Sequence, residues 1–407
     1  MFNYNPPGVP AAGLPVGSPF GAPVVQPQPP PSTPTQPEND LIRGMNYLAD
    51  YSGCGHWRMI WPEHILNAHQ KAVIHSTTMM ALDERYYNDT KTVRVQRQAT
   101  ETQLRFIKLL REYSSRLGFK IVYEIDDIVF HEDIPDYNKF KTAFTDPVIR
   151  ESALAIMQEV DEITCTCKFM ADYYADKTGN SNVTVIPNYP PKWWMGQYYD
   201  KDNVARNYRK TRKKPRVVYP ASGAHFDVEG RVKYKDDFYH VNDVVRKTCD
   251  QIQWVFIGAY PIPLTDLVKQ GKLEFHPWQR LYEYPALLAS LNPSLLIAPL
   301  VDSTFNRAKS DLKYIEACCY GIPFIGQDMC TYQDAPYKFN TGDELIDQIK
   351  RIMGNWSLYQ KISKAGRQVA DTRWLELDQN ADKYYELYAY PYKDPRRKLI
   401  NSLAENQ

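Results

Sequence analysis

The sequence predicts an α/β protein made of two Rossmann-like domains that face each other across a cleft. Short apolar runs alternate with segments of helical periodicity along most of the chain, which is typical of parallel sheets flanked by helices. This alternation stops over residues 188–216 and then starts again. Because 407 residues suffice for two full hydrophobic cores, we expect a linker between two Rossmann-like halves.

The ends of the chain differ in composition from the rest. Residues 1–40 hold twelve of the 30 prolines and predict a disordered, Pro-rich N-terminal tail. Residues 343–404 are rich in tyrosine and predict mostly helical structure. The expected boundaries are 1–40 for the tail, 41–195 for the N-terminal domain, 196–215 for a basic linker, 216–370 for the C-terminal domain and 371–407 for C-terminal helices.

The expected elements of the first domain follow a glycine-containing loop at Ser52–Gly55. Strands are predicted at 71–77, 119–125, 162–167 and 182–188, and helices at 56–70, 97–117, 148–159 and 169–179, the last closed by Gly179. In the second domain, strands are predicted at 216–222, 252–258, 272–277, 294–300 and 322–327, and helices at 236–248, 281–291 and 308–320. Gly321 and Pro323 end the last of these helices.

Composition excludes several functional classes. A net charge of +1 gives no global field for a polyanionic partner, so a basic site must be local. Seven cysteines, an odd number, fit neither a zinc ladder nor a disulfide framework and predict reduced thiols in a cytoplasm. No apolar run approaches the roughly 20 residues that a membrane span needs.

The segment Asp302–Glu316, DSTFNRAKSDLKYIE, is the clearest candidate site. It follows an apolar strand, and ligands of parallel sheets bind beyond the carboxyl ends of strands. Lys309 and a helix N-terminus would attract phosphate, whereas the carboxylate of Glu316, two turns further on, suits a neutral diol. This pairing predicts a nucleoside diphosphate. The alternative is a solvated helix face, although Lys309 and Lys313 would repel each other at that spacing.

The run FNRAKSDLKYIEACCYGIPFI resembles the donor-site segment of group-1 (family 4-like) retaining glycosyltransferases, which have the GT-B fold. The resemblance implies that Asn306, Lys309 and Ser310 hold the diphosphate and that Glu316 holds the ribose. Common members carry a further Glu eight residues before the ribose Glu, where this chain has Ala308. It also implies that the first domain binds the acceptor, that the second binds the donor, and that the C-terminal helices cross back to the first domain.

Three further segments fit the same family in the same order: VIPNYP, YPASGAHFD and EFHPWQRLYEYPALLASL. By resemblance, the second lies near the donor phosphates and the third near the nucleobase. A hydrogen-bonded loop residue is the alternative for His225, and core packing is the alternative for Trp278 and Tyr284. The donor-binding candidates in the second domain are Ser222, Gly223, His225, Trp278, Tyr284, Asn306, Ser310, Lys313 and Glu316.

The first domain offers two further groups of candidates. Gly53 and Gly55 would let the backbone approach a ligand, and Arg58 would reach the diphosphate across the cleft or remain a surface arginine. Asp126 and Asp127 end a strand, and adjacent extended residues point to opposite faces. We assign one of them, Asp127 in preference to Asp126, to orienting sugar or acceptor hydroxyls; His131 and Glu132 are companions. The catalytic candidates are Asp127, Lys309 and Asp126.

The resemblance implies a metal-independent transfer that retains the anomeric configuration and uses a UDP-sugar as co-substrate, with no cofactor. Lys309 would stabilise the leaving diphosphate, and a lysine clamp makes a metal pair at Asp126 and Asp127 redundant. A donor phosphate oxygen would take the acceptor proton. The sugar would be glucose or a pentose such as arabinose, and both a monomer and a dimer fit the sequence.

The basic run 206–216 suggests the acceptor. Seven of its eleven residues are Lys or Arg, Tyr208 interrupts it, and two Trp and two Tyr precede it. Local basicity with aromatics is typical of nucleic-acid binding, whereas a solvated linker is the alternative. A weaker resemblance is to phage enzymes that glycosylate 5-hydroxymethylcytosine in double-stranded DNA, which implies a host cytoplasm. The alternatives are a capsule or surface polysaccharide transferase and a non-enzymatic DNA-binding protein. The DNA-binding candidates are Arg206, Arg209, Lys210, Arg212, Lys213 and Lys214.

Overall fold

The computed structural model describes residues 41–227 and 235–389. These residues contain two parallel sheets, each of six strands, as the alternating sequence pattern predicts. The predicted tail at 1–40, the segment 228–234 and the predicted helical residues 390–407 lie outside the described residues. The division of the chain at the domain boundaries given above stays a prediction.

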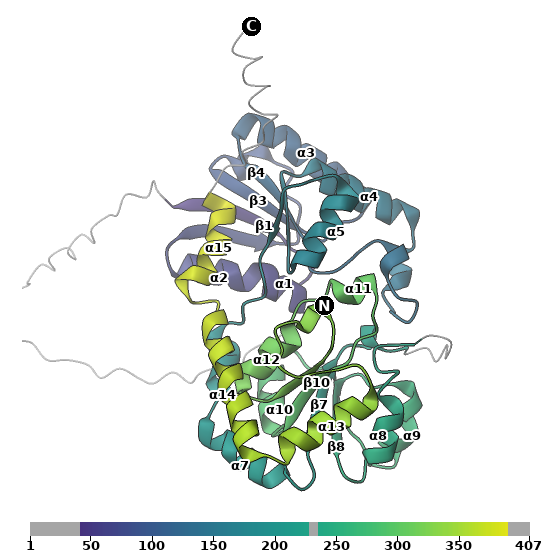
Figure 1. Ribbon diagram of the computed structural model, residues 1–407. Coiled ribbons are helices and arrows are strands. Elements are labelled where there is room, and N and C mark those ends of the chain that lie inside the picture. Colours follow the sequence, from purple (N-terminus) through teal and green to yellow (C-terminus); the bar gives the residue numbers. More distant parts are fainter. Residues whose placement is uncertain (1–40, 228–234, 390–407) are drawn as a thin grey trace, which may run out of the picture. The chain divides into compact units, whose positions relative to one another are not determined.

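The first sheet has the strand order β2-β1-β3-β4-β5-β6, with all neighbours parallel. Figure 1 shows its strands flanked by α3, α4 and α5. The strands are β1 (Ile42–Tyr47), β2 (Ala72–Thr77), β3 (Thr90–Gln96), β4 (Lys120–Glu124), β5 (Glu162–Cys165) and β6 (Val183–Val185). The helices are α1 (Gly53–Gly55), a π-helical turn (His56–Ile60), α2 (Trp61–Ala68), α3 (Glu101–Leu117), α4 (Pro147–Glu159) and α5 (Lys168–Thr178).

The second sheet has the strand order β12-β11-β10-β7-β8-β9 and is also parallel. Its strands are β7 (Arg216–Ala221), β8 (Gln253–Gly258), β9 (Glu274–Pro277), β10 (Leu295–Ala298), β11 (Phe324–Gln327) and β12 (Lys338–Phe339). The accompanying helices are α8 (Asn242–Thr248), α9 (Thr265–Lys269), α10 (Tyr284–Ser290), α11 (Thr304–Arg307), α12 (Leu312–Tyr320) and α13 (Gly342–Met353). Gly321 ends α12 in the left-handed region, at φ 64°, as predicted.

The chain passes between the two sheets twice. Residues between the sheets form α6 (Lys192–Met195) and α7 (Lys201–Thr211), so much of the predicted basic linker is helical. After α14 (Trp356–Arg373), the chain returns to the first sheet as α15 (Asp378–Ala389), which contacts β1, β3 and α2 (Figure 1). There Thr92 Oγ1 donates to the carbonyl oxygen of Leu387, and Tyr388 Oη donates to Asn46 Oδ1 at 2.6 Å.

Several local predictions were wrong. The expected loop Ser52–Gly55 is already helical from Gly53, and the helix expected from Arg97 begins at Glu101, because Thr100 and Gln103 form a capping box. The helix expected from Asp236 begins at Asn242. Strands β1, β3 and β12 were not predicted. In β3, Thr92, Arg94 and Gln96 are polar residues that the fold buries completely.

Candidate functional site

The strand orders locate the candidate site. In the second sheet the order reverses between β7 and β10, and in the first sheet between β1 and β3. Ligands of open parallel sheets bind beyond the carboxyl ends of the strands at such reversals. The loops after β7 and β10 carry most of the predicted donor residues. A cavity of about 510 Å³ lies nearby, lined by Phe169 of α5 and by residues that follow β10, β11 and β12.

Lys309 connects the two sheets directly. Its Nζ lies 3.2 Å from both carboxylate oxygens of Asp127, which follows β4. The same ammonium lies 4.1 Å from the ring centre of Phe305. Burial raises the pKa of the Asp127 carboxyl, and the positive charge of Lys309 opposes that rise. The structure thus brings together two of the three catalytic candidates, Lys309 and Asp127.

The helical geometry predicted for Lys309 was wrong. The helix expected over residues 308–320 is interrupted, so that Lys309 and Ser310 lie in the turn between α11 and α12. Long-range contacts hold this turn: Cys167 Sγ donates to the carbonyl oxygen of Ala308 at 3.4 Å, and Arg373 forms an ion pair with Asp311 at 3.0 Å. Lys309 therefore does not share a helical face with Lys313, and the repulsion between them is not fixed by helical spacing.

Lys313 is anchored to a buried histidine. Its Nζ lies 3.3 Å from His225 Nε2, and His225 Nδ1 lies 2.7 Å from Asp237 Oδ2. Burial lowers the pKa of His225 to about 4, so the imidazole is neutral at pH 7. The neutral ring can then donate from Nδ1 to Asp237 and accept from Lys313 at Nε2. Burial also lowers the pKa of Lys313.

Asp237 joins His225 to the first domain. Its Oδ1 accepts hydrogen bonds from Tyr137 Oη at 2.7 Å, from Asn306 Nδ2 at 2.6 Å and from the backbone N–H of Val301 at 2.9 Å. Asn306 is fully buried, and its Oδ1 has no hydrogen-bond partner among the described residues. In this structure Asn306 holds the loop after β10 in place, and its predicted contact with a diphosphate stays a prediction.

Glu316 lies behind the lysines, on α12. It is 8% exposed, and its Oε2 accepts a hydrogen bond of 2.9 Å from Tyr284 Oη of α10. Burial raises the pKa of Glu316, while the hydrogen bond from Tyr284 and the charge of Lys313 lower it. The carboxylate keeps its second oxygen for another donor. Trp278, by contrast, is 70% exposed, just beyond the end of β9.

Ser310 and Arg58 belong to one chain of hydrogen bonds. Asn188 Nδ2 donates to Ser310 Oγ at 3.0 Å, and Arg58 Nη1 donates to Asn188 Oδ1 at 3.0 Å. Arg58 is 0% exposed and pairs with Glu124 at 2.7 Å. Since the guanidinium is enclosed and already bonded, the structure gives no support to its predicted contact with the diphosphate. Its observed role is to position Asn188.

The remaining candidates lie on loops after β1, β4 and β7. Ser222 caps the short 3₁₀ turn Gly223–His225 by accepting from the backbone N–H of Ala224. A Cβ at Gly55 would lie 1.9 Å from the carbonyl oxygen of Asp50, whereas one at Gly53 would meet open space. Only Gly55 therefore needs to be glycine for packing.

The other acidic candidates have basic neighbours within the first domain. Asp126 lies 3.7 Å from Arg97 Nη1. Arg97 has φ 50°, an uncommon conformation for a residue with a side chain, at the strand-order reversal of the first sheet. Glu132 pairs with Arg150 at 2.9 Å, and His131 Nδ1 lies 2.9 Å from Arg150 Nη1.

The basic run lies away from this site. It covers the end of α7 and the turn before β7, so its last residues lie at the amino edge of the second sheet. Tyr208 packs on Trp356 and Tyr359 at the start of α14, whereas Arg373 at the other end of α14 contacts Asp311. The helical rise makes this separation about 20 Å. All six basic candidates are exposed.

Sequence reasoning missed four residues of the site: Arg97, Tyr137, Asn188 and Asp237. Arg97 immediately follows β3 and Asn188 lies three residues beyond the end of β6, positions like those of other site residues, but β3 itself was not recognised. Tyr137 and Asp237 meet only through the tertiary fold, since they are 100 residues apart. No local pattern in the sequence distinguishes them from other tyrosines and aspartates.

Comparison with known proteins identifies the architecture. No protein-family model and no curated protein sequence matches the chain. Among solved structures, Anabaena Alr3699/HepE in complex with UDP matches with a TM-score of 0.58 at 11% identity, over 86% of this chain and 100% of that chain. An alpha-glucosyltransferase in complex with UDP and a 13-mer DNA containing an HMU base matches with a TM-score of 0.50 at 11% identity, over 90% and 98% of the two chains. TarM matches with a TM-score of 0.50 at 10% identity, over 75% and 57%. These neighbours are GT-B glycosyltransferases.

The chain has the GT-B fold. In GT-B terms, the Lys309–Asp127 contact joins the second Rossmann-like half to the first. Within residues 41–227 and 235–389, every helix is too short or too polar to span a lipid bilayer. In the same residues, no three His, Cys, Asp or Glu side chains cluster as metal ligands. Metal independence and a cytoplasmic location stay predictions.

Proposed function

We propose that this protein is a glycosyltransferase that moves a sugar from a UDP-sugar to a hydroxyl acceptor with retention of the anomeric configuration. The observation that carries the proposal is the set of charges at the reversal between β7 and β10. Lys309 and Lys313 supply two cations there, Glu316 supplies a carboxylate further along α12, and Asp127 faces them from the first sheet. The GT-B fold supports the same function.

The donor would use these groups in order along the second domain. The diphosphate would replace Asp127 as the partner of Lys309 and lie near Lys313, since phosphate oxygens accept charge-assisted hydrogen bonds from ammonium groups. The ribose diol would donate to the free oxygen of Glu316. His225 and Asp237 hold Lys313 in position and make no direct contact with the donor in this proposal.

The chemical step would break the bond between the anomeric carbon and the diphosphate oxygen and form a bond from that carbon to the acceptor oxygen. The acceptor proton would pass to a diphosphate oxygen on the same face. Lys309 and Lys313 would stabilise the negative charge that develops on the leaving UDP. Asp127, released by Lys309, would accept a hydrogen bond from a sugar or acceptor hydroxyl. These lysines would fill the role of a metal ion.

For the acceptor, we propose 5-hydroxymethylcytosine in double-stranded DNA. Two features support it: the exposed basic run 206–214, and the likeness in fold to the alpha-glucosyltransferase whose complex holds DNA with an HMU base. A polysaccharide is the second candidate. The position of the basic run favours a polysaccharide acceptor. The run lies about 20 Å from Asp311 along α14, so DNA phosphates bound to the run would not lie at the site.

A donor and acceptor panel tests the proposal. The purified protein is incubated with UDP-glucose, UDP-galactose, UDP-N-acetylglucosamine and UDP-arabinose, and UDP release is measured with and without EDTA. The expected result is turnover with at least one donor, insensitive to EDTA and lost in Lys309→Ala. Turnover that persists near the wild-type rate in Lys309→Ala would contradict the assigned site, and turnover lost in EDTA would contradict metal independence.

Analysis of the products tests the identity of the acceptor and the retention of the anomeric configuration. Hydroxymethylated DNA and unmodified DNA are offered with the active donor, and the nucleosides are analysed by mass spectrometry. NMR of the product gives the anomeric configuration. A sugar on hydroxymethylcytosine with the anomeric configuration of the donor supports both the DNA acceptor and the retaining mechanism. An oligosaccharide is offered as a second acceptor. If UDP is released, the DNA is unchanged and the oligosaccharide is glycosylated, a polysaccharide replaces DNA as the proposed acceptor.

A further inference from the structure

A second cavity lies at the opposite edge of the second sheet. Its volume is about 400 Å³, within the range of small-molecule sites. Pro293 and Ile322 line it, and they precede β10 and β11, whereas most donor candidates of the second domain follow β7 and β10. The other walls come from α7, from the turn before it, from the ends of α10 and α12, and from Tyr359 of α14. The cavity is therefore distinct from the site described above.

The lining is polar but carries no positive charge. The lining residues include four with carboxamides, namely Gln197, Asn203, Asn207 and Asn292, and one with a carboxylate, Asp200. No Lys, Arg or His is among the lining residues. Carboxamides offer both donors and acceptors, whereas phosphate would find no cation and one repelling carboxylate. A neutral ligand that presents many hydroxyl groups fits this lining.

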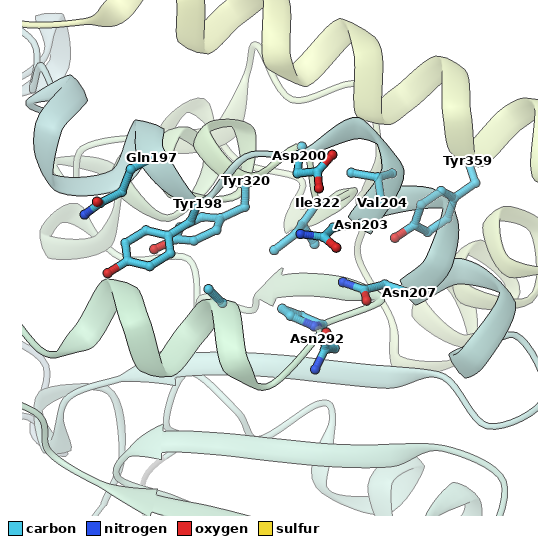
Figure 2. Close-up of a pocket in the computed structure, with 13 residues that line it drawn as sticks. Gln197, Tyr198, Asp200, Asn203, Val204, Asn207, Asn292, Tyr320, Ile322 and Tyr359 are labelled. Atoms are coloured by element: carbon cyan, nitrogen blue, oxygen red, sulfur yellow. The ribbon is translucent and has the colours of Figure 1, made fainter.

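The carboxamides are available for a ligand. Figure 2 shows Asn203 and Asn207 on the same helix, one turn apart, on the side where Asn292 lies. Within the described residues, the side chains of Gln197, Asn203 and Asn207 form no hydrogen bond to the protein. Asn292 uses only its Nδ2, which donates to the carbonyl oxygen of Ser290. Two half-buried asparagines with unused amide groups in one concave site are otherwise without a structural role.

An aromatic wall completes the cavity. The rings of Tyr198 and Tyr320 stack with their centres 5.9 Å apart and their planes at 22°. Tyr320 Oη is held by the carbonyl oxygen of Pro285 at 2.9 Å, so the buried ring supports the half-exposed Tyr198. Tyrosine presents an apolar ring and a polar hydroxyl, which suits the C–H face and the hydroxyl rim of a pyranose.

We infer that the cavity lined by Tyr198, Asn203 and Asn207 is a binding site for a neutral saccharide, separate from the donor site. The carboxamides would bond vicinal hydroxyls, and Tyr198 would pack against the ring carbons. Such a site would hold a saccharide on the enzyme at a distance from the donor site. It needs no donor to be bound, so its test does not depend on the transferase activity.

The test measures saccharide binding in the absence of UDP-sugar. Glucose, galactose, N-acetylglucosamine, maltotriose and cellotriose are offered to the full chain at ~10 mM, above the millimolar dissociation constants of weak ligands. Saturation-transfer NMR detects binding, and titration calorimetry measures it. We expect at least one probe to bind, and Asn203→Ala combined with Asn207→Ala to weaken it about 30-fold, because two hydrogen bonds are lost.

Two further variants make the result specific. Ala289→Leu adds bulk to the cavity wall and should also weaken binding, whereas Lys201→Ala, an exposed residue of α7 outside the lining, should not. Thermal unfolding shows that each variant is folded. The inference is overturned by a lack of binding to all five saccharides, or by binding that the asparagine and Ala289 variants leave unchanged. Tighter binding of uridine monophosphate that the same variants abolish would overturn the ligand class.

Discussion

Lys309 Nζ lies 3.2 Å from both oxygens of Asp127, and this ion pair joins the loop after β10 to the end of β4. Both side chains are partly enclosed, at 21% and 32% exposure. The carboxylate is the partner of the Lys309 ammonium in this structure. If the diphosphate replaces the carboxylate, the two residues should affect binding in opposite directions.

Substitution of the two residues should separate donor binding from turnover. Lys309→Ala should weaken UDP binding about tenfold or more, because a charge-assisted hydrogen bond is lost. Asp127→Asn should leave UDP binding unchanged or tighter, because Lys309 loses a competing anion, while turnover falls about 100-fold. Calorimetry with UDP and steady-state rates measure the two effects. Lys272→Ala, which removes only an exposed pair with Asp250, is the control; weaker UDP binding in Asp127→Asn would contradict the competition.

Glu316 and Lys313 should give the reaction a bell-shaped pH profile. Burial raises the pKa of Glu316 above its ordinary 4.5 and lowers that of Lys313 below its ordinary 10.5. The ribose contact needs the ionised carboxylate of Glu316, so kcat/KM for the donor should fall at low pH, where this group is protonated. The diphosphate contact needs the ammonium of Lys313, so kcat/KM should also fall at high pH, where this group is neutral. The two apparent pKa values belong to the pair.

Tyr284→Phe provides a sharper version of this test. The tyrosine hydroxyl donates to Glu316 and lowers its pKa, so its removal should shift the acid limb of kcat/KM to higher pH. Glu316→Gln should remove the acid limb and raise the KM for the donor. An acid limb that neither substitution moves would show that another group is titrating.

His225 should make folding stability depend on pH. Its pKa is about 4 in the folded chain against 6.5 ordinarily, so the folded state binds fewer protons than the unfolded state between these values. Stability from this group is complete above pH 6.5 and is lost as the pH falls toward 4. Between pH 7 and 5 the loss is roughly 2 kcal/mol.

A difference between variants isolates this contribution. Burial raises the pKa of Glu316, so the folded state binds more protons at this group than the unfolded state. Its effect on stability is therefore opposite to that of His225, because it stabilises the fold as the pH falls. The loss on going from pH 7 to pH 5 in urea unfolding should therefore be compared between wild type and His225→Gln. We expect the larger loss in wild type. Equal losses would mean that His225 is not neutral in the folded chain.

The fold was predictable because apolar strands in a parallel sheet are continuous in sequence. The failure at β3 has a physical cause: Arg94 and Thr92 are fully buried, and Glu124 and the residues of α15 satisfy them. In the sequence, the residues of a buried ion pair look the same as those of an exposed, charged segment. The C-terminal helix that makes this burial possible is almost 300 residues further along the chain.

The candidate site was predictable in part for a related reason. Lys309, Lys313 and Glu316 lie within eight residues of one another, so their charge pattern is visible locally. The turn at Lys309 was not predictable, because it depends on Cys167 and Arg373 from distant elements. The same holds for Asp237, whose partners Tyr137, Asn306 and His225 come from three separate segments.

The basic run should contribute to DNA binding without affecting the donor site. Replacing Arg209, Lys210, Arg212 and Lys213 by Gln should lower DNA affinity and reduce the slope of log K against log salt, because fewer counterions are released. UDP binding should not change, since the run lies at the amino edge of the second sheet. Fluorescence anisotropy over a series of salt concentrations measures the slope. An unchanged slope would remove the run from any DNA interface.

Gly53 and Gly55 offer a matched pair of substitutions in one turn of helix. Gly53→Ala places a methyl group in open space and should change stability by less than about 1 kcal/mol, with the better helix former tending to stabilise. Gly55→Ala places the same group 1.9 Å from the carbonyl oxygen of Asp50, so the backbone must move and the loss should exceed about 2 kcal/mol. Urea unfolding measures both. Asp50 also accepts hydrogen bonds from Ser52 and Gly55, so this movement should disturb the loop after β1. If both variants lose the same stability, the close approach to Asp50 is not what requires glycine at position 55.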